Sequence, residues 1–204
     1  MEVDWGKLIE QAAATATGTK PGARAVTDEQ VAGKIKNLAK LGYIPDAQTP
    51  AIVRAYMQGY GILLTGPAGT GKTMLMRLLC GNGRIQHAQR DIADWGLSQI
   101  GEWFEWRDGK EVCIDDLGAE RTSSSYGEKD DVLRLVIERR SAQHGARTHV
   151  TTNLDGAGVR ERYGDRILDR LLGMCKVFKT SGPSKRKPEP VGPITVQSIE
   201  EVEL

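Results

Sequence analysis

The stretch GPAGTGKT, from Gly66 to Thr73, restricts the possible folds of this chain more than any other feature of its sequence. It matches the pattern G-x-x-x-x-G-K-[ST] and lies between an apolar stretch typical of a strand (GILLTG) and one typical of a helix (TMLMRLLC). Its glycines allow the backbone to turn tightly with amide N–H groups pointing inward, as a loop around a phosphate group requires. A glycine-rich turn that arose by chance is the competing interpretation, and the flanking strand and helix argue against it.

This loop also predicts the cofactors. Lys72 is expected to reach the β- and γ-phosphates of ATP, and the Thr73 hydroxyl is expected to hold Mg²⁺. The positive end of the helix that begins near Lys72 adds to the attraction for phosphate. We therefore expect ATP and Mg²⁺ to bind here, through Gly66, Pro67, Ala68, Gly69, Thr70, Gly71, Lys72 and Thr73.

A second polar motif, VCIDDLGAE, ends another apolar stretch. Asp115 is predicted to lie on the Mg²⁺ side of the site, and Asp116 stands where a carboxylate that orients the attacking water is needed. Glu120 is a rival for that second role. Two aspartates after a strand are equally typical of a capped turn, and it is the phosphate-binding loop that favours the catalytic interpretation.

Asn153 follows a third apolar stretch, in THVTTNL. If that strand lies between the other two, Asn153 reaches the γ-phosphate region and helps to hold the attacking water. An asparagine at a strand end is otherwise an ordinary turn former, so this role depends on the neighbouring motifs.

From residue 61 onward, strands alternate with helices, which indicates an α/β fold with a mostly parallel sheet covered on both faces. Thr27 and Gln30 predict a capping box at the start of a helix, and Thr49 is the expected N-cap of the next. The expected strands are 61–66, 84–89, 111–115, 148–152 and 176–180, and the expected helices are 1–15, 28–41, 50–58, 73–80, 91–106 and 126–143.

Four blocks of the sequence resemble one family. DDLGAE, YGEKDDVLRLVIERRS, VTTNL and YGDRILDRLLGMC occur in the order found in the DnaC-type bacterial and phage helicase loaders and the related transposition-helper ATPases, which are AAA+ proteins. The resemblance covers residues 51–187. It implies a P-loop AAA+ three-layer sandwich with a mostly parallel five-stranded sheet. An aspartate at the position of Asp116 also resembles what such loaders carry.

The resemblance also implies roles for single residues. Asn153 aligns with the sensor 1 residue, and Arg170 aligns with the arginine finger that completes the ATP site of a neighbouring subunit. Arg166, one helical turn earlier, is the alternative finger. Arg186, in GPSKRK, aligns with the basic sensor 2 region. The competing interpretation is that Arg166 and Arg170 form ion pairs with nearby aspartates on the surface of their own helix.

The predicted domains follow from these alignments. Residues 1–48 form a short N-terminal helical extension that can bind a partner, residues 49–188 form the AAA+ ATPase domain, and residues 189–204 form an acidic C-terminal tail. The residues after the sensor 2 region are too few for a full helical lid.

Composition excludes several classes of protein. No apolar run approaches the length of a membrane span. The N-terminus carries acidic residues early and has no long apolar region, unlike a signal peptide, so a cytoplasmic protein without membrane contact is expected. The three cysteines lack metal-ligand spacing and are expected to be buried free thiols. The three histidines also lack such spacing, and we expect them to be structural or on the surface.

Charge is unevenly distributed along the chain. Residues 91–131 hold 12 acidic and 4 basic residues (net −8), and residues 147–187 hold 10 basic and 4 acidic residues (net +6). Such asymmetry suggests contact with a polyanion or with an electrostatically matched neighbour. Charges that lie on separate solvated faces are the alternative.

The expected function follows from the motifs and the resemblance together. It is a slow ATPase similar to the DnaC-like loaders, which assembles head to tail on binding ATP, binds single-stranded DNA and acts on a replicative helicase in DNA replication. Four aromatic residues in DWGLSQIGEWFEW would stack on bases or pack in the core. A transposition-helper ATPase and a non-hydrolysing nucleotide-gated adaptor are the alternatives, and a small-molecule P-loop kinase is the least favoured.

Overall fold

The computed structural model describes residues 24–93, 110–120, 128–143 and 147–186. In these residues five strands form one sheet in the order β2-β3-β4-β1-β5, and every neighbouring pair is parallel. The expected α/β sandwich with a five-stranded sheet is confirmed. The strands are β1 (Gly61–Thr65), β2 (Ile85–His87), β3 (Val112–Leu117), β4 (Thr148–Thr152) and β5 (Cys175–Lys179).

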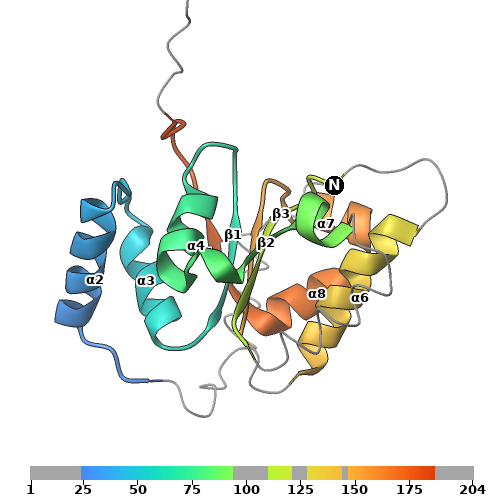
Figure 1. Cartoon of the computed structure of the whole chain (residues 1–204), viewed down its shortest axis with the longest axis horizontal. Coiled ribbons are helices and arrows are strands. Elements are labelled where there is room, and N and C mark those ends of the chain that lie inside the picture. The colour runs from blue at the N-terminus through green and yellow to red at the C-terminus, as the bar shows by residue number, and fades with distance from the viewer. Residues whose placement is uncertain (1–23, 94–109, 121–127, 144–146, 187–204) are drawn as a thin grey trace, which may run out of the picture.

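Helices cover both faces of the sheet (Figure 1). On one face lie α2 (Asp28–Lys40), α3 (Thr49–Met57) and α4 (Lys72–Cys80); on the other lie α6 (Glu128–Ala142), α7 (Gly156–Tyr163) and α8 (Asp165–Met174). A short 3₁₀ helix, η1 (Asn82–Arg84), precedes β2, and a π-helix, η2 (Ala88–Ala93), follows it.

Each face of the sheet packs in its own hydrophobic cluster because successive strand residues point to opposite sides. In β1, Ile62 and Leu64 pack with α2, α3 and α4, whereas Leu63 packs with α6, α7 and α8. Helix α2 contributes Val31 and Leu38 to the first cluster. The described part of the segment 1–48 therefore shares a core with the sheet.

Several local predictions can be compared with the structure. The capping box of Thr27 and Gln30 at the start of α2 is confirmed. The prediction that Thr49 caps α3 is wrong by one residue: Gln48 is the N-cap, and the Asp46 carboxylate accepts hydrogen bonds from the backbone of Gln48 and Thr49. The first three residues of the helix predicted over 91–106 form the end of η2. Four predictions lie outside the described residues: the remainder of that helix (94–106), the helix 1–15, the roles of the four aromatic residues and the tail 189–204.

The described helices are all too short or too polar to cross a bilayer. All three cysteines are buried and free, as expected. No group of three or more His, Cys, Asp or Glu side chains in the described residues is arranged to hold a metal ion.

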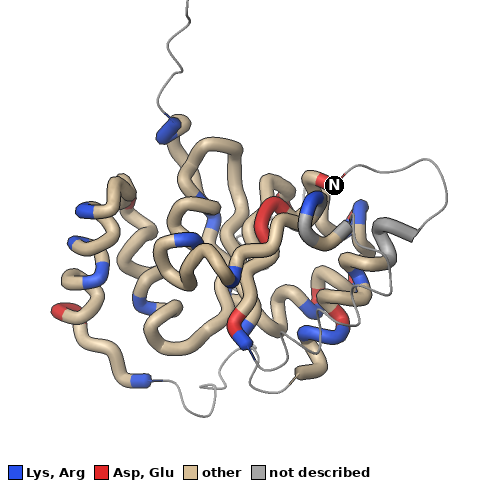
Figure 2. Tube along the Cα trace, viewed as in Figure 1, with Lys and Arg blue, Asp and Glu red and all other residues tan. Residues whose placement is uncertain are grey.

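Part of the charge asymmetry of the sequence is balanced within the chain. The acidic segment 91–131 meets the basic segment 147–187 through two ion pairs, Glu111 with Arg147 and Glu120 with Arg162. Positions of both signs are scattered along the described trace (Figure 2). The electrostatically matched neighbour that the sequence suggested is therefore, for these four residues, another part of the same fold.

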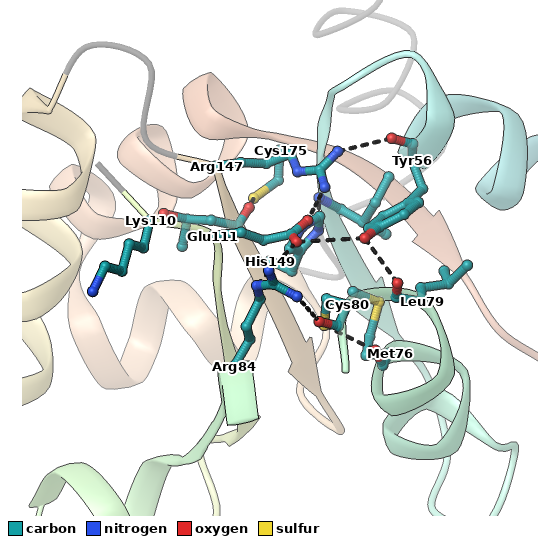
Figure 3. Close-up of polar contacts among 12 residues, drawn as sticks. Tyr56, Met76, Leu79, Cys80, Arg84, Lys110, Glu111, Arg147, His149 and Cys175 are labelled. Carbon is teal, nitrogen blue, oxygen red and sulfur yellow. Dashed lines mark hydrogen bonds and ion pairs between the residues drawn. The ribbon is translucent and has the colours of Figure 1, made fainter. Parts of the chain in front are cut away.

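A cluster of polar side chains lies at the amino-terminal ends of β3 and β4 (Figure 3). The His149 ring is fully buried: its Nδ1 accepts a hydrogen bond from the Ile62 backbone N–H at 3.1 Å, and its Nε2 lies 3.0 Å from Glu111 Oε1. Because Nδ1 is an acceptor, the proton is on Nε2, which donates to Glu111. We call this the amino-edge cluster; its members are Tyr56, Arg84, Glu111, Arg147 and His149.

The amino-edge cluster holds the end of α4. Tyr56 Oη donates to the Leu79 carbonyl at 2.8 Å, and Arg84 Nη1 donates to the Cys80 carbonyl at 2.6 Å. Both carbonyls belong to the last turn of α4, where backbone acceptors have no partner within the helix. The helix is therefore fixed at the end remote from the phosphate-binding motif.

Candidate functional site

The motif Gly66–Thr73 forms the turn between β1 and the start of α4, as its flanking residues predicted. Two of its positions require glycine because residues of the segment after β5 lie close to the backbone there. A Cβ on Gly66 would lie 2.2 Å from the Thr180 carbonyl oxygen, and one on Gly69 would lie 2.3 Å from Ser184 Oγ. Both also have positive φ angles, 137° and 83°, which residues with a side chain rarely adopt.

Lys72 lies at the centre of the loop and is 5% exposed. Its Nζ donates hydrogen bonds to the carbonyls of Gly66 (2.7 Å) and Pro67 (2.8 Å) and to Asn153 Oδ1 (2.8 Å). Burial lowers the pKa of Lys72, and the nearby Asp116 and Asp115 carboxylates act against that shift. A protonated amine held by two loop carbonyls and one amide can exchange these partners for phosphate oxygens.

Asp115 and Thr73, the two predicted Mg²⁺ contacts, lie side by side. Thr73 Oγ1 donates to Asp115 Oδ1 at 2.9 Å, and Thr151 Oγ1 donates to the same oxygen at 2.7 Å. Asp115 is buried, so the two hydroxyls compensate for its lost hydration. A hydroxyl and a carboxylate are suitable oxygen ligands for Mg²⁺, which usually takes one or two carboxylates and completes its shell with phosphate and water oxygens.

Asp116 has the only positive φ angle, 57°, among the non-glycine residues that the structure describes. Its backbone N–H donates to Thr151 Oγ1 at 3.0 Å, so one hydroxyl bonds both aspartates. The pairing of β3 with β4 is irregular between Ile114 and Leu117, and this irregularity turns the Asp116 side chain toward the cavity. His87 Nε2 lies 3.7 Å from Asp116 Oδ2.

A cavity of about 390 Å³ lies over the loop. It brings together Lys72, Thr73, Asp116, Asn153 and Arg186 from four separate parts of the chain, and the sequence had placed all five residues in the site. Asp115 lies against a neighbouring cavity of about 260 Å³, with Arg77 bordering both. The remaining residues that line the larger cavity are Ala68, Gly69, Gly71, Met74, Arg77 and Lys185.

The position of Asn153 depends on strand order. Because β4 lies between β1 and β3, the residue that follows β4 falls between the loop Gly66–Thr73 and the two aspartates. Its contact with Lys72 spans 81 positions in the sequence. The strand before Asn153 therefore has the middle position that the sequence analysis required for Asn153 to reach the site.

Glu120, the rival to Asp116, is buried away from the cavity. Its Oε1 accepts hydrogen bonds from Arg162 Nε at 2.9 Å and from the Tyr163 hydroxyl, and its Oε2 accepts one from the Gly118 N–H at 3.0 Å. Its side chain is 0% exposed. A carboxylate with this set of partners holds α7 to the end of β3 and has no access to water in the cavity.

Arg166 and Arg170 are both exposed on α8 but differ in their partners. Arg166 Nε lies 2.9 Å from Glu138 Oε1, on the neighbouring helix α6. Arg170 makes no ion pair within the part of the chain that the structure describes. Neither arginine pairs with Asp165 or Asp169 there, and Asp165 pairs with Arg160 instead. Neither arginine lines the cavity of its own chain.

Sequence reasoning missed His87, Arg77 and Lys185. His87 had been assigned to structure or surface, yet the register of β2 against β3 places it opposite Asp115. Arg77 lies on α4 a little over one turn after Thr73, a spacing that predicts a shared helix face. Lys185 belongs to GPSKRK, in which the sequence analysis selected Arg186, and its contacts depend on how the chain folds back after β5.

Comparisons with known proteins add little to this picture. No protein-family model matches the chain, and no curated protein matches it. Among solved structures, the chain is similar to a crystal structure of the DnaC helicase loader, with 17% sequence identity and a TM-score of 0.48. That similarity covers 69% of this chain and 94% of the other.

Proposed function

We propose that the chain binds ATP with Mg²⁺ at the loop Gly66–Thr73 and hydrolyses it slowly. The observation that carries this proposal is the meeting of Lys72, Thr73, Asp115 and Asn153 within hydrogen-bonding distance at the start of α4. Lys72 would neutralise the β- and γ-phosphates, and Thr73 and Asp115 would hold Mg²⁺. The magnesium ion would supply charge neutralisation between the phosphates.

In this proposal Asp116 orients the attacking water and Asn153 helps to place it. Asp116 borders the cavity, whereas the rival Glu120 is engaged in a buried ion pair. The slow rate that we propose follows from the short reach of an aspartate. If Asp116 cannot promote attack at all, the chain is a non-hydrolysing nucleotide-gated adaptor.

We further propose that the site is completed by a second copy of the chain. Arg170 is exposed, has no ion pair among the described residues and lies outside the cavity of its own chain. A planar cation of this kind stabilises charge on a transferred phosphoryl group when a neighbour supplies it. Heterologous head-to-tail contacts between copies build rings or spirals.

The cellular role that we propose is that of a DnaC-like helicase loader that binds single-stranded DNA in DNA replication. Its support is the four sequence blocks that resemble the loaders, and the segment 1–48 would contact the helicase. Several basic side chains of the segment 147–187 form ion pairs within the chain, namely those of Arg147, Arg162, Arg166 and Lys185. Lys179 is exposed and would be available for DNA phosphates. A transposition helper would share the ATP site and differ in its partner.

Mixing two inactive variants tests the shared site. Lys72→Ala loses its own loop but still offers Arg170, and Arg170→Ala keeps the loop but lacks the arginine. Each variant alone should lose ATP turnover, by roughly 10³–10⁵-fold for the arginine. Turnover should return in part in the mixture, because some contacts then pair an intact loop with an intact arginine.

Arg166→Ala is the matched control, since Arg166 lies on the same helix and pairs with Glu138. Recovery of ATP turnover with Arg166→Ala in place of Arg170→Ala would show that Arg166 is the arginine supplied to the neighbouring site. Absence of recovery in either mixture, with mixed oligomers shown to form, would contradict the shared site. Release of a replicative helicase onto circular single-stranded DNA, measured with the active protein, separates a loader from a transposition helper.

A further inference from the structure

The segment from Thr180 to Arg186, which we call the strap, lies across the phosphate-binding loop. At one end the Thr180 N–H donates to the Thr65 carbonyl at 2.7 Å, and the hydroxyls of Thr180 and Thr70 are 2.8 Å apart. At the other end the Lys185 N–H donates to the Gly69 carbonyl at 2.8 Å. The strap is therefore attached at both of its ends, to the last residue of β1 and to the loop itself.

The Lys185 side chain connects the strap to the turn between α2 and α3. Its Nζ donates to the Ile44 carbonyl and to Asp46 Oδ2, each at 2.8 Å, and lies 4.9 Å from the centre of the Tyr43 ring. Its aliphatic part lies 3.3 Å from the position of a Cβ on Gly71. One side chain thus contacts the loop, the strap and the N-terminal helices.

Asp46 is itself firmly placed. Its Oδ1 accepts hydrogen bonds from the N–H groups of Gln48 and Thr49 and from the Thr49 hydroxyl, which leaves Oδ2 for Lys185. Burial alone would raise the pKa of the Asp46 carboxyl, but the hydrogen bonds from Lys185 and Thr49 lower that pKa overall. The carboxylate is therefore charged when it meets Lys185.

We propose that Lys185 and Asp46 are positioning residues that hold the strap against the phosphate-binding loop and so keep Arg186 at the nucleotide cavity. Through this ion pair, occupation of the cavity is coupled to the turn between α2 and α3. The proposal rests on the proposed nucleotide binding and extends it to two residues of which one, Asp46, does not line the cavity.

Asp46→Asn distinguishes this role from simple electrostatics. An asparagine retains Oδ1 for the bonds that begin α3 but replaces Oδ2 with an NH₂ group, which cannot accept a hydrogen bond from Lys185. Removal of a negative charge near a polyanion site should strengthen nucleotide binding by electrostatics alone. If Asp46 positions the strap, Asp46→Asn should instead weaken nucleotide binding, because the strap would lie against the loop for a smaller fraction of the time.

The measurement is calorimetric titration of the full chain with Mg·ADP, which avoids turnover. If the fraction of molecules with the strap held against the loop falls to about a tenth, the Kd of Asp46→Asn for Mg·ADP rises about tenfold. Lys185→Met, which leaves the start of α3 intact, should also weaken binding, and the double variant should be no weaker than the weaker single variant. Lys185→Arg should restore most of the affinity, because an arginine can also donate to Asp46.

Glu29→Gln is the matched control: it removes one exposed negative charge from α2, outside the contacts of the strap. It should bind Mg·ADP as the unmodified chain does. If Asp46→Asn or Lys185→Met binds Mg·ADP as tightly as the control, the positioning role is overturned while nucleotide binding stands. If the unmodified chain does not bind, both proposals are overturned.

Discussion

The two ends of helix α4 lie over two polar clusters that resemble each other in composition and differ in what they leave exposed. At its start, Lys72 and Thr73 meet Asp115 and Asn153 beside a cavity of about 390 Å³. At its end, the amino-edge cluster surrounds Glu111, which contacts Tyr56, Arg84, Arg147 and His149 (Figure 3). Glu111 lines neither this cavity nor the neighbouring cavity of about 260 Å³.

Both clusters use the same two strands. Glu111 and Asp115 lie an even number of positions apart along β3 and its approach, and His149 and Thr151 do so along β4, so all four point to the face that α4 covers. The difference lies in the partners. At the amino edge each charge meets an opposite charge. At the carboxyl edge the Thr151 hydroxyl bonds the Asp115 carboxylate and the Asp116 backbone N–H, and Lys72 is the cation near both carboxylates.

This difference has a physical consequence. A buried charge that is already paired contributes to stability only while its partner remains, and loss of one partner leaves the other uncompensated. Adjacent like charges repel and are retained where a ligand will balance them. The amino edge is therefore expected to govern stability, and the carboxyl edge to govern binding.

The largest expected effect comes from removing one carboxylate charge at each edge. Glu111→Gln leaves Arg147 without the carboxylate that balances its charge and should lower the free energy of unfolding by about 3 kcal/mol, measured by urea denaturation. Asp115→Asn keeps an oxygen for Thr73 and Thr151, so the same measurement should change by less than about 1 kcal/mol. Its Mg²⁺-dependent ATP turnover should instead fall by on the order of 10²-fold.

The comparison fails if the two variants exchange these effects. Equal destabilisation by both would mean that the aspartate is as important to folding as the glutamate. Turnover that survives in Asp115→Asn would remove Asp115 from the metal site.

A smaller effect is expected from pH. Burial lowers the pKa of His149 below its ordinary value of 6.5, so the unfolded chain binds a proton that the folded chain does not. The free energy of unfolding should therefore fall as the pH decreases below about 6.5, by up to about 1.4 kcal/mol per pH unit. Burial, aided by Glu111, raises the pKa of Tyr56 to about 12, so stability should also fall as the pH rises above about 10.

His149→Gln is the control for the acid limb. A glutamine offers an oxygen to the Ile62 N–H and an NH₂ group to Glu111, and it does not titrate. Denaturation midpoints between pH 7 and pH 5 should change less steeply in this variant than in the unmodified chain. Identical slopes would show that the histidine does not set the acid limit.

The smallest expected effect compares two neighbours on β4. Thr151 Oγ1 bonds Asp115 and the Asp116 N–H, whereas Thr152 Oγ1 donates to the Leu117 carbonyl on the other side of the strand. Thr151→Val and Thr152→Val should each cost about 1–2 kcal/mol of stability. Only Thr151→Val should reduce ATP turnover as well, by about tenfold, the equivalent of about 1.4 kcal/mol.

Steady-state turnover at saturating Mg·ATP, measured well below the unfolding temperature of both variants, separates these effects. A loss of turnover in both would mean that stability alone explains the result. No loss in either would remove the Thr151 hydroxyl from the placement of the two aspartates.

Much of the fold and of the candidate site could be predicted from local patterns. The motif Gly66–Thr73 predicted its own strand, turn and helix, and Thr27 and Gln30 predicted the cap of α2, because these features depend on residues a few positions apart. The alternation of strands and helices predicted the parallel sheet for the same reason. The choice of Asp116 over Glu120 did not follow from spacing, since both residues come shortly after the strand expected over 111–115.

Strand order, register and the return of the chain after β5 were decided by long-range packing. The middle position of β4 puts Asn153 beside Lys72, the register of β2 puts His87 opposite Asp115, and the strap brings Lys185 to Asp46. The partners in these contacts are far apart in the sequence, so the local sequence around each residue does not indicate whether the two residues meet. Glu120 shows the reverse case: the partner that removes it from the site, Arg162, lies 42 positions away on α7, and only the packing of that helix against β3 brings the two charges together.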